Sequence, residues 1–416
     1  MSNISQSVSG TSSPSKQNKF SIYFTIVLII FDVICDSVIL NSFSKETYFK
    51  EIFLFVLLLF LQIIASPIQS GVSDRYGRKK SLIITLSATL MSLLILFLHT
   101  SKVFNYFIIL VITNLVKGFL GNTTPLVWSV IADADSKDER FFFTVSESGY
   151  AIGYLLVIYA NNILSKLSDS FSLFIMIPVS VVLIYLLIKH FRDFKDKECQ
   201  NGSFFESLKE EPRLIVRDLK EKSLRLLYTS FTLLEISLYS VLILSADFQS
   251  NEAFFPAIAM MVGYIVGSVM MKFCGGKTNK TMMKYGFILS IVSLIPYIVA
   301  SIFFKNINFL LQGGYFFHAI GNAILSPTTL SLSTQGMEDH TKGKRFGILT
   351  SFDTLALLIT SFIIIIYKKS DLNINYVVDF SFITIFFAWI VYRKYEKFNG
   401  EKSLKNEVKK QDGQSL

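Results

Sequence analysis

The sequence is poor in charge, cysteine and histidine. Charged residues make up 17% of its 416 residues, where a soluble domain carries about 25%. The three cysteines (Cys35, Cys199 and Cys274) are far apart and predict neither a disulfide framework nor a metal-ligand spacing. We also find no nucleophile elbow, phosphate-binding loop or zinc motif. We therefore expect no enzyme, no cofactor and no bound metal.

Hydrophobic residues, in contrast, make up 51% of the chain, and 40 residues are Phe. They fall into blocks close to the length of roughly 20 residues that a membrane-spanning helix needs. These blocks cover residues 20–43, 51–69, 81–99, 104–128, 141–163, 171–190, 225–247, 253–271, 281–304, 307–331, 346–367 and 376–392. A signal peptide supplies only one such block. The pattern predicts an all-α membrane protein with twelve transmembrane helices.

A charged segment divides these blocks six and six. We expect five regions: a disordered tail (1–19), an N-terminal six-helix bundle (20–190), a linker with an amphipathic surface helix (191–224), a C-terminal six-helix bundle (225–392) and a charged tail (393–416). Gly121-Asn122 in the fourth block has a counterpart, Gly321-Asn322, in the tenth. This repeat indicates a duplicated half, which is a feature of secondary transporters.

The distribution of Lys and Arg predicts the orientation. Of the 40 basic residues, 32 lie in the tails and in alternate loops on the same side, and seven lie in the loops of the other side. Because basic residues collect on the cytoplasmic side, we expect both termini in the cytoplasm, with a bacterial inner (plasma) membrane as the setting. The net charge of +9 then needs no nucleic acid as a partner.

The second and third blocks are joined by Ser70-Gly71-Val72-Ser73-Asp74-Arg75-Tyr76-Gly77-Arg78-Lys79-Lys80. Gly77 suits a tight turn, and the bases after it can anchor the loop on the cytoplasmic side. Asp74 can pair with these bases or with the positive end of another helix. The segment could also serve only as a topology anchor, although that role does not require Asp74.

This segment resembles the loop motif of the major facilitator superfamily, G-x-x-x-D-R-x-G-R-R/K, with Ser70 in place of the first Gly. Lys117-Gly118-Phe119-Leu120-Gly121 is similar to the family's R-x-x-x-G, and Ile131-Ala132-Asp133 with Glu139-Arg140 is similar to the following loop of drug-efflux members. Phe31-Asp32 in the first block resembles the tetracycline and multidrug efflux branch. The Gly-Pro stretch that antiporters of this branch carry is missing from the fifth block, which leaves uptake open.

The resemblance implies the major facilitator fold and an inner gate in which the motif's acid and bases join the two halves. The implied gate residues are Asp74, Arg75, Gly77, Arg78, Lys79, Asp133 and Arg140. Glu147 and Asp353 lie about two turns from the cytoplasmic end of their blocks, and we expect them to be further gate contacts.

Ionisable residues within the blocks are the candidates for transport, because a charge at mid-bilayer costs roughly 2.5–3.5 kcal/mol on insertion scales. Asp32 and Asp36 share one face of the first block, and two carboxylates so close favour proton binding. Lys117 could be their counter-ion or an anion site. Glu235 could bind substrate or protons, or could simply be paired. His318 could titrate or be merely hydrogen-bonded.

The sequence thus predicts a monomeric, proton-coupled secondary transporter of a small organic solute, embedded in the lipid bilayer. Efflux of amphipathic compounds and uptake of a metabolite or siderophore are held as equal alternatives. A non-transporting receptor or lipid-handling protein on the same fold is the alternative from another class. The pair Gly263 and Gly267 has the small-xxx-small spacing that favours close helix packing.

Overall fold

A computed structural model describes residues 16–43, 46–98, 105–134, 138–164, 169–191, 212–213, 215–246, 254–274, 276–296, 299, 308–335, 337, 342–369 and 375–414. Within these residues all regular structure is helical, as predicted. The predicted disordered tail, up to residue 15, and most of the linker, residues 192–211, lie outside the described residues.

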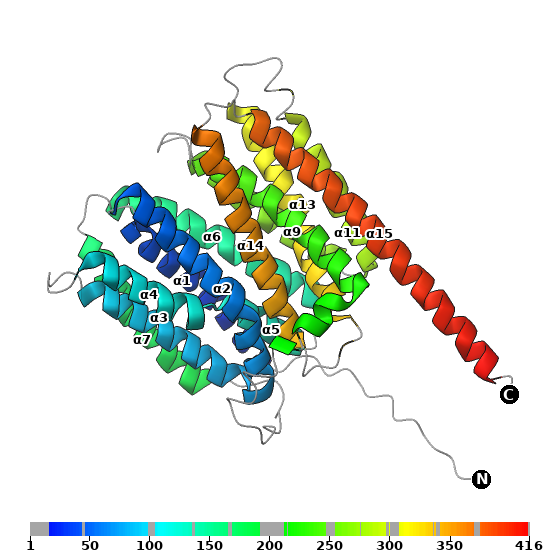
Figure 1. Cartoon of the computed structure of the whole chain (residues 1–416), viewed down its shortest axis with the longest axis horizontal. Helices are drawn as coiled ribbons and strands as arrows, with labels where there is room; N and C mark the ends of the chain where they lie inside the picture. The colour runs from blue at the N-terminus through cyan, green and yellow to red at the C-terminus, as the bar shows by residue number, and fades with distance from the viewer. Residues whose placement is uncertain are drawn as a thin grey trace, which may run out of the picture.

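The helices form two groups that lie side by side (Figure 1). The first half contains α1 (Lys16–Phe43), α2 (Tyr48–Tyr76), α3 (Arg78–Leu98), α4 (Tyr106–Leu120), α5 (Thr124–Asp133), α6 (Glu139–Leu164) and α7 (Asp169–His190). The second half contains α9 (Lys222–Ala246), α10 (Phe254–Phe273), α11 (Asn279–Val292), α13 (Asn308–Thr334), α14 (Lys342–Lys369) and α15 (Asn375–Gln414). At the seam, α14 packs against α2, and α10 packs against α6.

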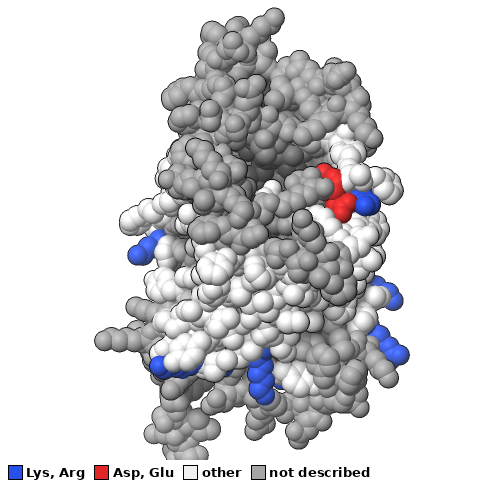
Figure 2. All heavy atoms as spheres, turned by 90° about the vertical axis from the view of Figure 1, so that its left-hand side faces the viewer, with Lys and Arg blue, Asp and Glu red and all other residues white. Residues whose placement is uncertain are grey.

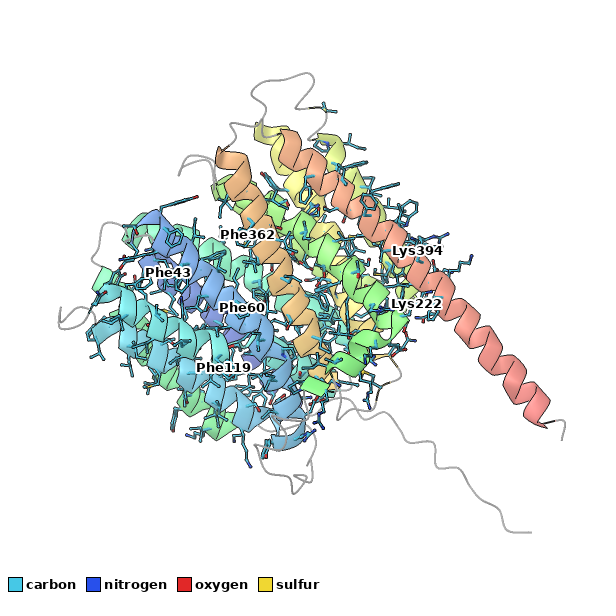
Figure 3. The ribbon with its side chains drawn as sticks, viewed as in Figure 1. Phe43, Phe60, Phe119, Lys222, Phe362 and Lys394 are labelled. Carbon is cyan, nitrogen blue, oxygen red and sulfur yellow. The ribbon has the colours of Figure 1, made fainter. Side chains whose placement is uncertain are left out.

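The surface of these helices is apolar. Six stretches of the described residues are long and apolar enough to cross a membrane: Phe20–Phe43, Tyr48–Tyr76, Arg78–Leu98, Tyr106–Asp133, Ser172–His190 and Lys342–Ile365. Phe60, Phe119 and Phe362 are each about half exposed, whereas Phe43 is buried (Figure 3). One face shows a wide uncharged area with Lys and Arg at its margins (Figure 2). Exposed aromatic side chains on long helices suit a lipid surrounding.

Two local features place the loop motif at one end of the first half. Gly77 has φ 96°, a conformation that glycine adopts without a steric penalty. Its N–H donates to Ser73 O at 3.1 Å and closes the end of α2. The chain then starts α3 at once with Arg78, so the bases that follow Gly77 sit in the first turn of this helix.

Small residues let helices approach closely at two contacts. A Cβ on Gly263 would lie 2.6 Å from Phe316 O, and one on Gly267 would lie 2.5 Å from the Ala323 side chain. The predicted close packing is therefore confirmed, with α13 as the partner of α10. Gly347 of α14 packs in the same way against α2, where a Cβ would lie 2.5 Å from Ser66 O.

The last helix continues beyond the predicted end of the span at residue 392. α15 runs on through the charged tail to Gln414. Glu396 pairs with Lys280 of α11 at 2.5 Å and with Arg393 at 3.0 Å, which favours continuation of the helix past the apolar stretch. In the linker, residues 215–220 are helical, and Ile215 and Leu219 pack on a core cluster shared by both halves.

Candidate functional site

The fourth span is broken near its middle. α4 ends at Leu120 and α5 begins at Thr124, and the three residues between them are buried and not helical. Pro125 accounts for the break, because it has no N–H to donate to the Gly121 carbonyl four residues earlier and its ring crowds that carbonyl. Backbone groups freed inside a membrane need other partners. Here charged side chains provide them.

Lys117 and Asp32 satisfy the two sides of the break. Lys117 Nζ donates to Gly121 O at 2.8 Å, and Thr123 N donates to Asp32 Oδ2 at 3.3 Å. The ammonium therefore lies at the negative, C-terminal end of α4, and the carboxylate at the positive, N-terminal end of α5. Each charge is placed where the helix dipole favours it.

The same lysine joins both aspartates of α1. Lys117 Nζ contacts the Asp32 carboxylate directly and lies 3.0 Å from Asp36 Oδ1. The Lys117 side chain is fully buried and that of Asp32 is 10% exposed, whereas that of Asp36 is 31% exposed. The sequence left a counter-ion or an anion site open for Lys117, and the structure places it as the counter-ion. We call Asp32, Asp36 and Lys117 the matched group.

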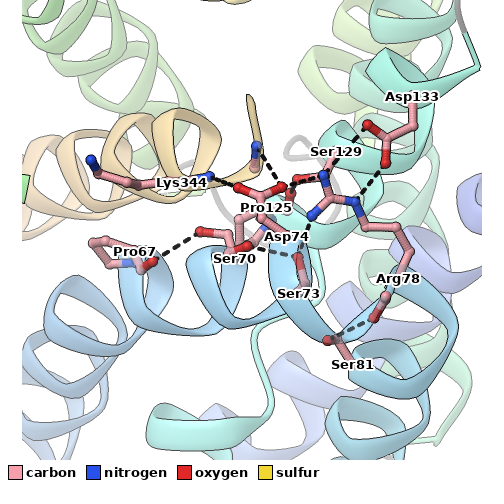
Figure 4. A network of polar contacts seen from close by, with 12 residues as sticks. Pro67, Ser70, Ser73, Asp74, Arg78, Ser81, Pro125, Ser129, Asp133 and Lys344 are labelled. Atoms are coloured by element: carbon pink, nitrogen blue, oxygen red, sulfur yellow. Dashed lines mark hydrogen bonds and ion pairs between the residues drawn. The ribbon is translucent and has the colours of Figure 1, made fainter. Parts of the chain in front are cut away.

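The loop motif forms a buried network at the end of α2 and the start of α3, and Figure 4 shows its polar contacts. Arg78 Nη2 donates to Asp74 Oδ1 at 2.5 Å, Arg78 Nε donates to Asp133 Oδ2 at 2.8 Å, and its other amino group contacts Ser73 Oγ. Only 2% of Arg78 is exposed. A buried guanidinium needs such pairing, since an unpaired buried charge is strongly unfavourable.

Asp74 also connects the two halves. Its carboxylate accepts from Gly343 N at 3.2 Å and from Lys344 N at 2.9 Å, both in the first turn of α14 (Figure 4). The start of α14 is thus a positive helix end, one of the two kinds of partner that the sequence allowed for Asp74. A Cβ on Gly343 would lie 2.6 Å from Asp74 Oδ1, so the approach requires glycine. Asp74, Arg78, Asp133 and the start of α14 form what we call the gate network.

Apolar and linker contacts close the same end. Phe346 of α14 packs edge-on against Trp128 of α5 and tilts against Phe143 of α6. Lys344 Nζ pairs with Asp218 of the linker at 3.0 Å. The halves are thus joined here by charge, by backbone hydrogen bonds and by aromatic packing.

The remaining predicted gate residues lie in different surroundings. Lys79 Nζ donates to Ile188 O at the end of α7, at 2.7 Å. Arg140 interacts with Glu139 at the start of α6. Arg75 is half-buried in the last turn of α2, and Gly77 forms the turn itself.

Glu147 and Asp353 are not with the gate network, although the sequence analysis placed them there. Each interacts electrostatically with the other, and both interact with Glu235 of α9. Asp353 Oδ1 accepts from Tyr239 OH at 2.7 Å. We call Glu147, Glu235 and Asp353 the unmatched group, because in the described part of the chain no Lys, Arg or His pairs with any of them.

His318 lies apart from both carboxylate groups. Its Nδ1 is 3.4 Å from Ser293 Oγ at the end of α11, within the second half. The repeated Gly-Asn pair also differs between the halves: Asn122 Nδ2 donates to Ser66 Oγ at 2.8 Å beside the break, whereas Asn322 Nδ2 donates to Tyr264 OH at 2.9 Å within the continuous α13.

Sequence reasoning missed the main-chain groups of the site, which are Gly121 O, Thr123 N, Gly343 N and Lys344 N. For the first two a signal was present, since Gly121-Asn122 followed by Pro125 inside an apolar block indicates an interrupted helix. For the other two, the sequence holds no sign of which helix end Asp74 meets.

Solved structures with the same fold are transporters. The E. coli fucose:proton symporter has a TM-score of 0.69 at 13% identity, covering 91% of this chain and 99% of the symporter. The human organic anion transporter MFSD10 has a TM-score of 0.68 at 12% identity, covering 89% and 99%. A bacterial homologue of the iron transporter ferroportin, in an outward-facing state, has a TM-score of 0.67 at 13% identity, covering 92% and 100%. At these identities the likeness shows the fold alone.

A search of curated proteins returns no match. The sequence itself matches the Major Facilitator Superfamily over residues 52–361, which is most of the chain. This match and the shared fold agree with the loop motif at Asp74 and with the two halves joined around it. The protein is a multi-pass integral membrane protein and belongs to the major facilitator superfamily of secondary transporters.

Proposed function

We propose that the protein is a proton-coupled carrier of a small organic solute that works by alternating access. The observation that carries the proposal is the position of α5. One end of this buried helix begins at the break that Asp32 and Lys117 hold, and the other end is Asp133, which binds Arg78 in the gate network. A change of charge at the matched group can therefore act on the gate through one rigid element.

The coupling step follows from the charges. With both aspartates ionised, the matched group has a net charge of −1. A proton that binds Asp36, the more exposed carboxylate, or Asp32 brings the group to neutrality and weakens its hold on Lys117. Protonated Asp32 is also a poorer acceptor for Thr123 N, so the start of α5 is released. Movement of α5 carries Asp133 away from Arg78, and Asp74 then holds α14 less firmly.

Together with the orientation that the Lys and Arg distribution predicts, the closed end supports an outward-facing state. With both termini in the cytoplasm, the gate network lies on the cytoplasmic side, and it is closed in this structure. Two of the similar structures are proton symporters, for fucose and for xylose, which supports a proton-driven cycle on this fold. The intact gate network also argues against a receptor that no longer changes state.

Reconstituted liposomes with an internal pH dye test this proposal. Pools of amino acids, nucleosides, sugars, siderophores and lipophilic cations are added under imposed proton gradients of both directions. We expect one pool to trigger a proton flux, and the gradient that supports it will separate uptake from efflux. In Asp32→Asn the flux should fall by about tenfold or more, in the range expected when a group acting in the rate-determining step is removed.

The matched control is Glu46→Gln, which removes an acid that pairs with Lys50 at 3.0 Å outside both carboxylate groups. It should transport like the wild type. If folded Asp32→Asn keeps both its transport and the pH dependence of transport, the coupling role of the matched group is wrong. If no pool triggers a flux in a folded preparation, proton-coupled transport of these solutes is rejected.

A further inference from the structure

We infer that the unmatched group binds a positively charged organic molecule, an amine or a quaternary ammonium, as the transported solute. This inference rests on the proposed transport function, and it specifies the chemical class of the transported solute. The group draws on both halves, since Glu147 is on α6 and the other two carboxylates are on α9 and α14. A solute held there would contact both halves, as alternating access requires.

Contacts between helices place these side chains around one region. Ser148, next to Glu147, contacts Ser268 of α10 at 3.0 Å between hydroxyl oxygens. One turn earlier on α10 is Tyr264, which interacts electrostatically with all three carboxylates. Tyr239, one turn after Glu235 on α9, donates to Asp353 of α14. The three carboxylates and the tyrosines Tyr239 and Tyr264 therefore lie in one region.

Glu235 is the observation that points to a ligand. Only 4% of the residue is exposed, and in the described part of the chain it has neither a hydrogen bond nor an ion pair. Ionised, it would be a buried charge without a counter-charge. Protonated, it would be a buried hydroxyl donor without an acceptor. Both forms are unfavourable, so Glu235 lacks the partner that a buried carboxyl group requires.

The chemistry of the surroundings selects an organic cation. Among the described residues no group of carboxylates, histidines and cysteines is arranged to hold a metal ion. The three carboxylates act on one another electrostatically but do not converge on one ion. Carboxylates spread around aromatic rings are the setting in which ammonium groups bind, through charge and through the ring faces of tyrosine. The Tyr264 ring is held in place by the hydrogen bond from Asn322.

The matched group shows what the unmatched group lacks. Two carboxylates in the first half share Lys117, an ammonium supplied by the chain itself. The unmatched group has three carboxylates and no such ammonium in the described residues. A cationic solute would take the place that Lys117 holds in the matched group.

Binding to the purified full-length protein in detergent, with no proton gradient, tests this inference alone. The probes are choline, benzyltrimethylammonium and spermidine, and 3,3-dimethylbutanol serves as the uncharged isostere of choline. We expect at least one cation to bind, seen by calorimetry and by a raised unfolding temperature, and the isostere not to bind. In Glu235→Gln the Kd should rise about tenfold or more, as when one partner of a buried charge pair is removed.

A second variant, Glu235→Lys, gives the group two carboxylates and one ammonium, the composition of the matched group. It should fold and should not bind the cation, whereas Glu46→Gln should bind like the wild type. The inference is overturned if no probe cation binds the wild type, if the isostere binds as well as choline, or if Glu235→Gln binds unchanged. If cations bind but no proton flux is seen in liposomes, the proposed proton coupling is rejected and the cation site is kept. If only uncharged solutes trigger a flux, the cation site is rejected and the proton coupling is kept.

Discussion

The two carboxylate groups lie at comparable distances along their helices, but only the matched group has a counter-charge among the described residues. At 1.5 Å per helical residue, Asp32 lies about 18 Å from the start of its span at Phe20, and Glu235 about 20 Å from the start of α9. Lys117 supplies the first group with a counter-charge from within, and two backbone groups add to the pairing. Among the described residues, the second group has a hydrogen bond from the Tyr239 hydroxyl and an electrostatic interaction with Tyr264, and no counter-charge.

This difference separates two tasks. When a group of charges is paired and hydrogen-bonded to the backbone, a change in its protonation alters the contacts that hold the neighbouring helices. A charge group without an internal counter-charge is suited to a partner that comes and goes. Each group is connected to the gate network by a different helix: α5 leads from the matched group to Asp133, and α14 leads from Asp353 back to Gly343.

The largest expected effect comes from breaking the matched group. Lys117→Met leaves Asp32 buried without its counter-charge and Gly121 O without its donor. We expect a loss of about 3–5 kcal/mol in the free energy of unfolding, typical when one partner of a buried pair is removed. Unfolding by SDS titration measures it. The double variant Lys117→Met with Asp32→Asn removes both charges and should recover part of the loss; a single variant as stable as the wild type would contradict the pairing.

A smaller effect is expected at the gate network, which helices from both groups reach. A Cβ in Gly343→Ala would clash with Asp74 and Arg78, whereas at Gly276 no atom lies within 4 Å, which makes Gly276→Ala the control. Overpacking of this kind costs about 1–3 kcal/mol, enough to favour an open gate. Spin labels on the exposed Lys80 and Lys284, one in each half, should show a longer-distance population in Gly343→Ala only. Identical distance distributions in both variants would refute the gate assignment.

The smallest expected effects are changes in the free energy of unfolding that differ in sign between the two carboxylate groups. Asp32→Asn should lower the free energy of unfolding by about 1–3 kcal/mol, because Lys117 loses one of its two carboxylates. Glu235→Gln should change it by less than about 1 kcal/mol, and towards greater stability, because a buried carboxyl group that is unfavourable in both its ionised and its protonated form is removed. Thermal unfolding of both variants in the same detergent decides this. Equal destabilisation by both changes would mean that Glu235 has a partner after all.

Much of the architecture could be predicted because its determinants are local. Apolar length gives the spans, and the loop motif gives the turn at Gly77 and the acid at Asp74. The pairing of Lys117 with the aspartates was one of two alternatives, since a lysine in a span needs either a counter-charge or an anionic ligand. The finer resemblance to drug-efflux members, the direction of transport and the orientation of the termini stay predictions.

The rest could not be predicted, because it depends on which helix ends meet. Position along the chain put Glu147 and Asp353 near the gate, whereas α6, α9 and α14 bring them together with Glu235. The break before α5 was signalled only weakly by Gly121 and Pro125, since both residue types are common in transmembrane helices and the block is apolar throughout. The extension of α15 past residue 392 depends on the pairing of Glu396 with a residue of α11.

The way in which Asp74 recognises α14 has a consequence for how the halves can be recombined. The carboxylate is bound by the main-chain N–H groups of residues 343 and 344, which any residue except proline can supply. Of these two positions only 343 is restricted, because a side chain there would collide with Asp74. A chimera that joins this N-terminal half to the C-terminal half of a different transporter therefore needs, for this contact, a helix that starts at the same place and carries a glycine in its first turn, and a second glycine at position 347 for the close approach to α2.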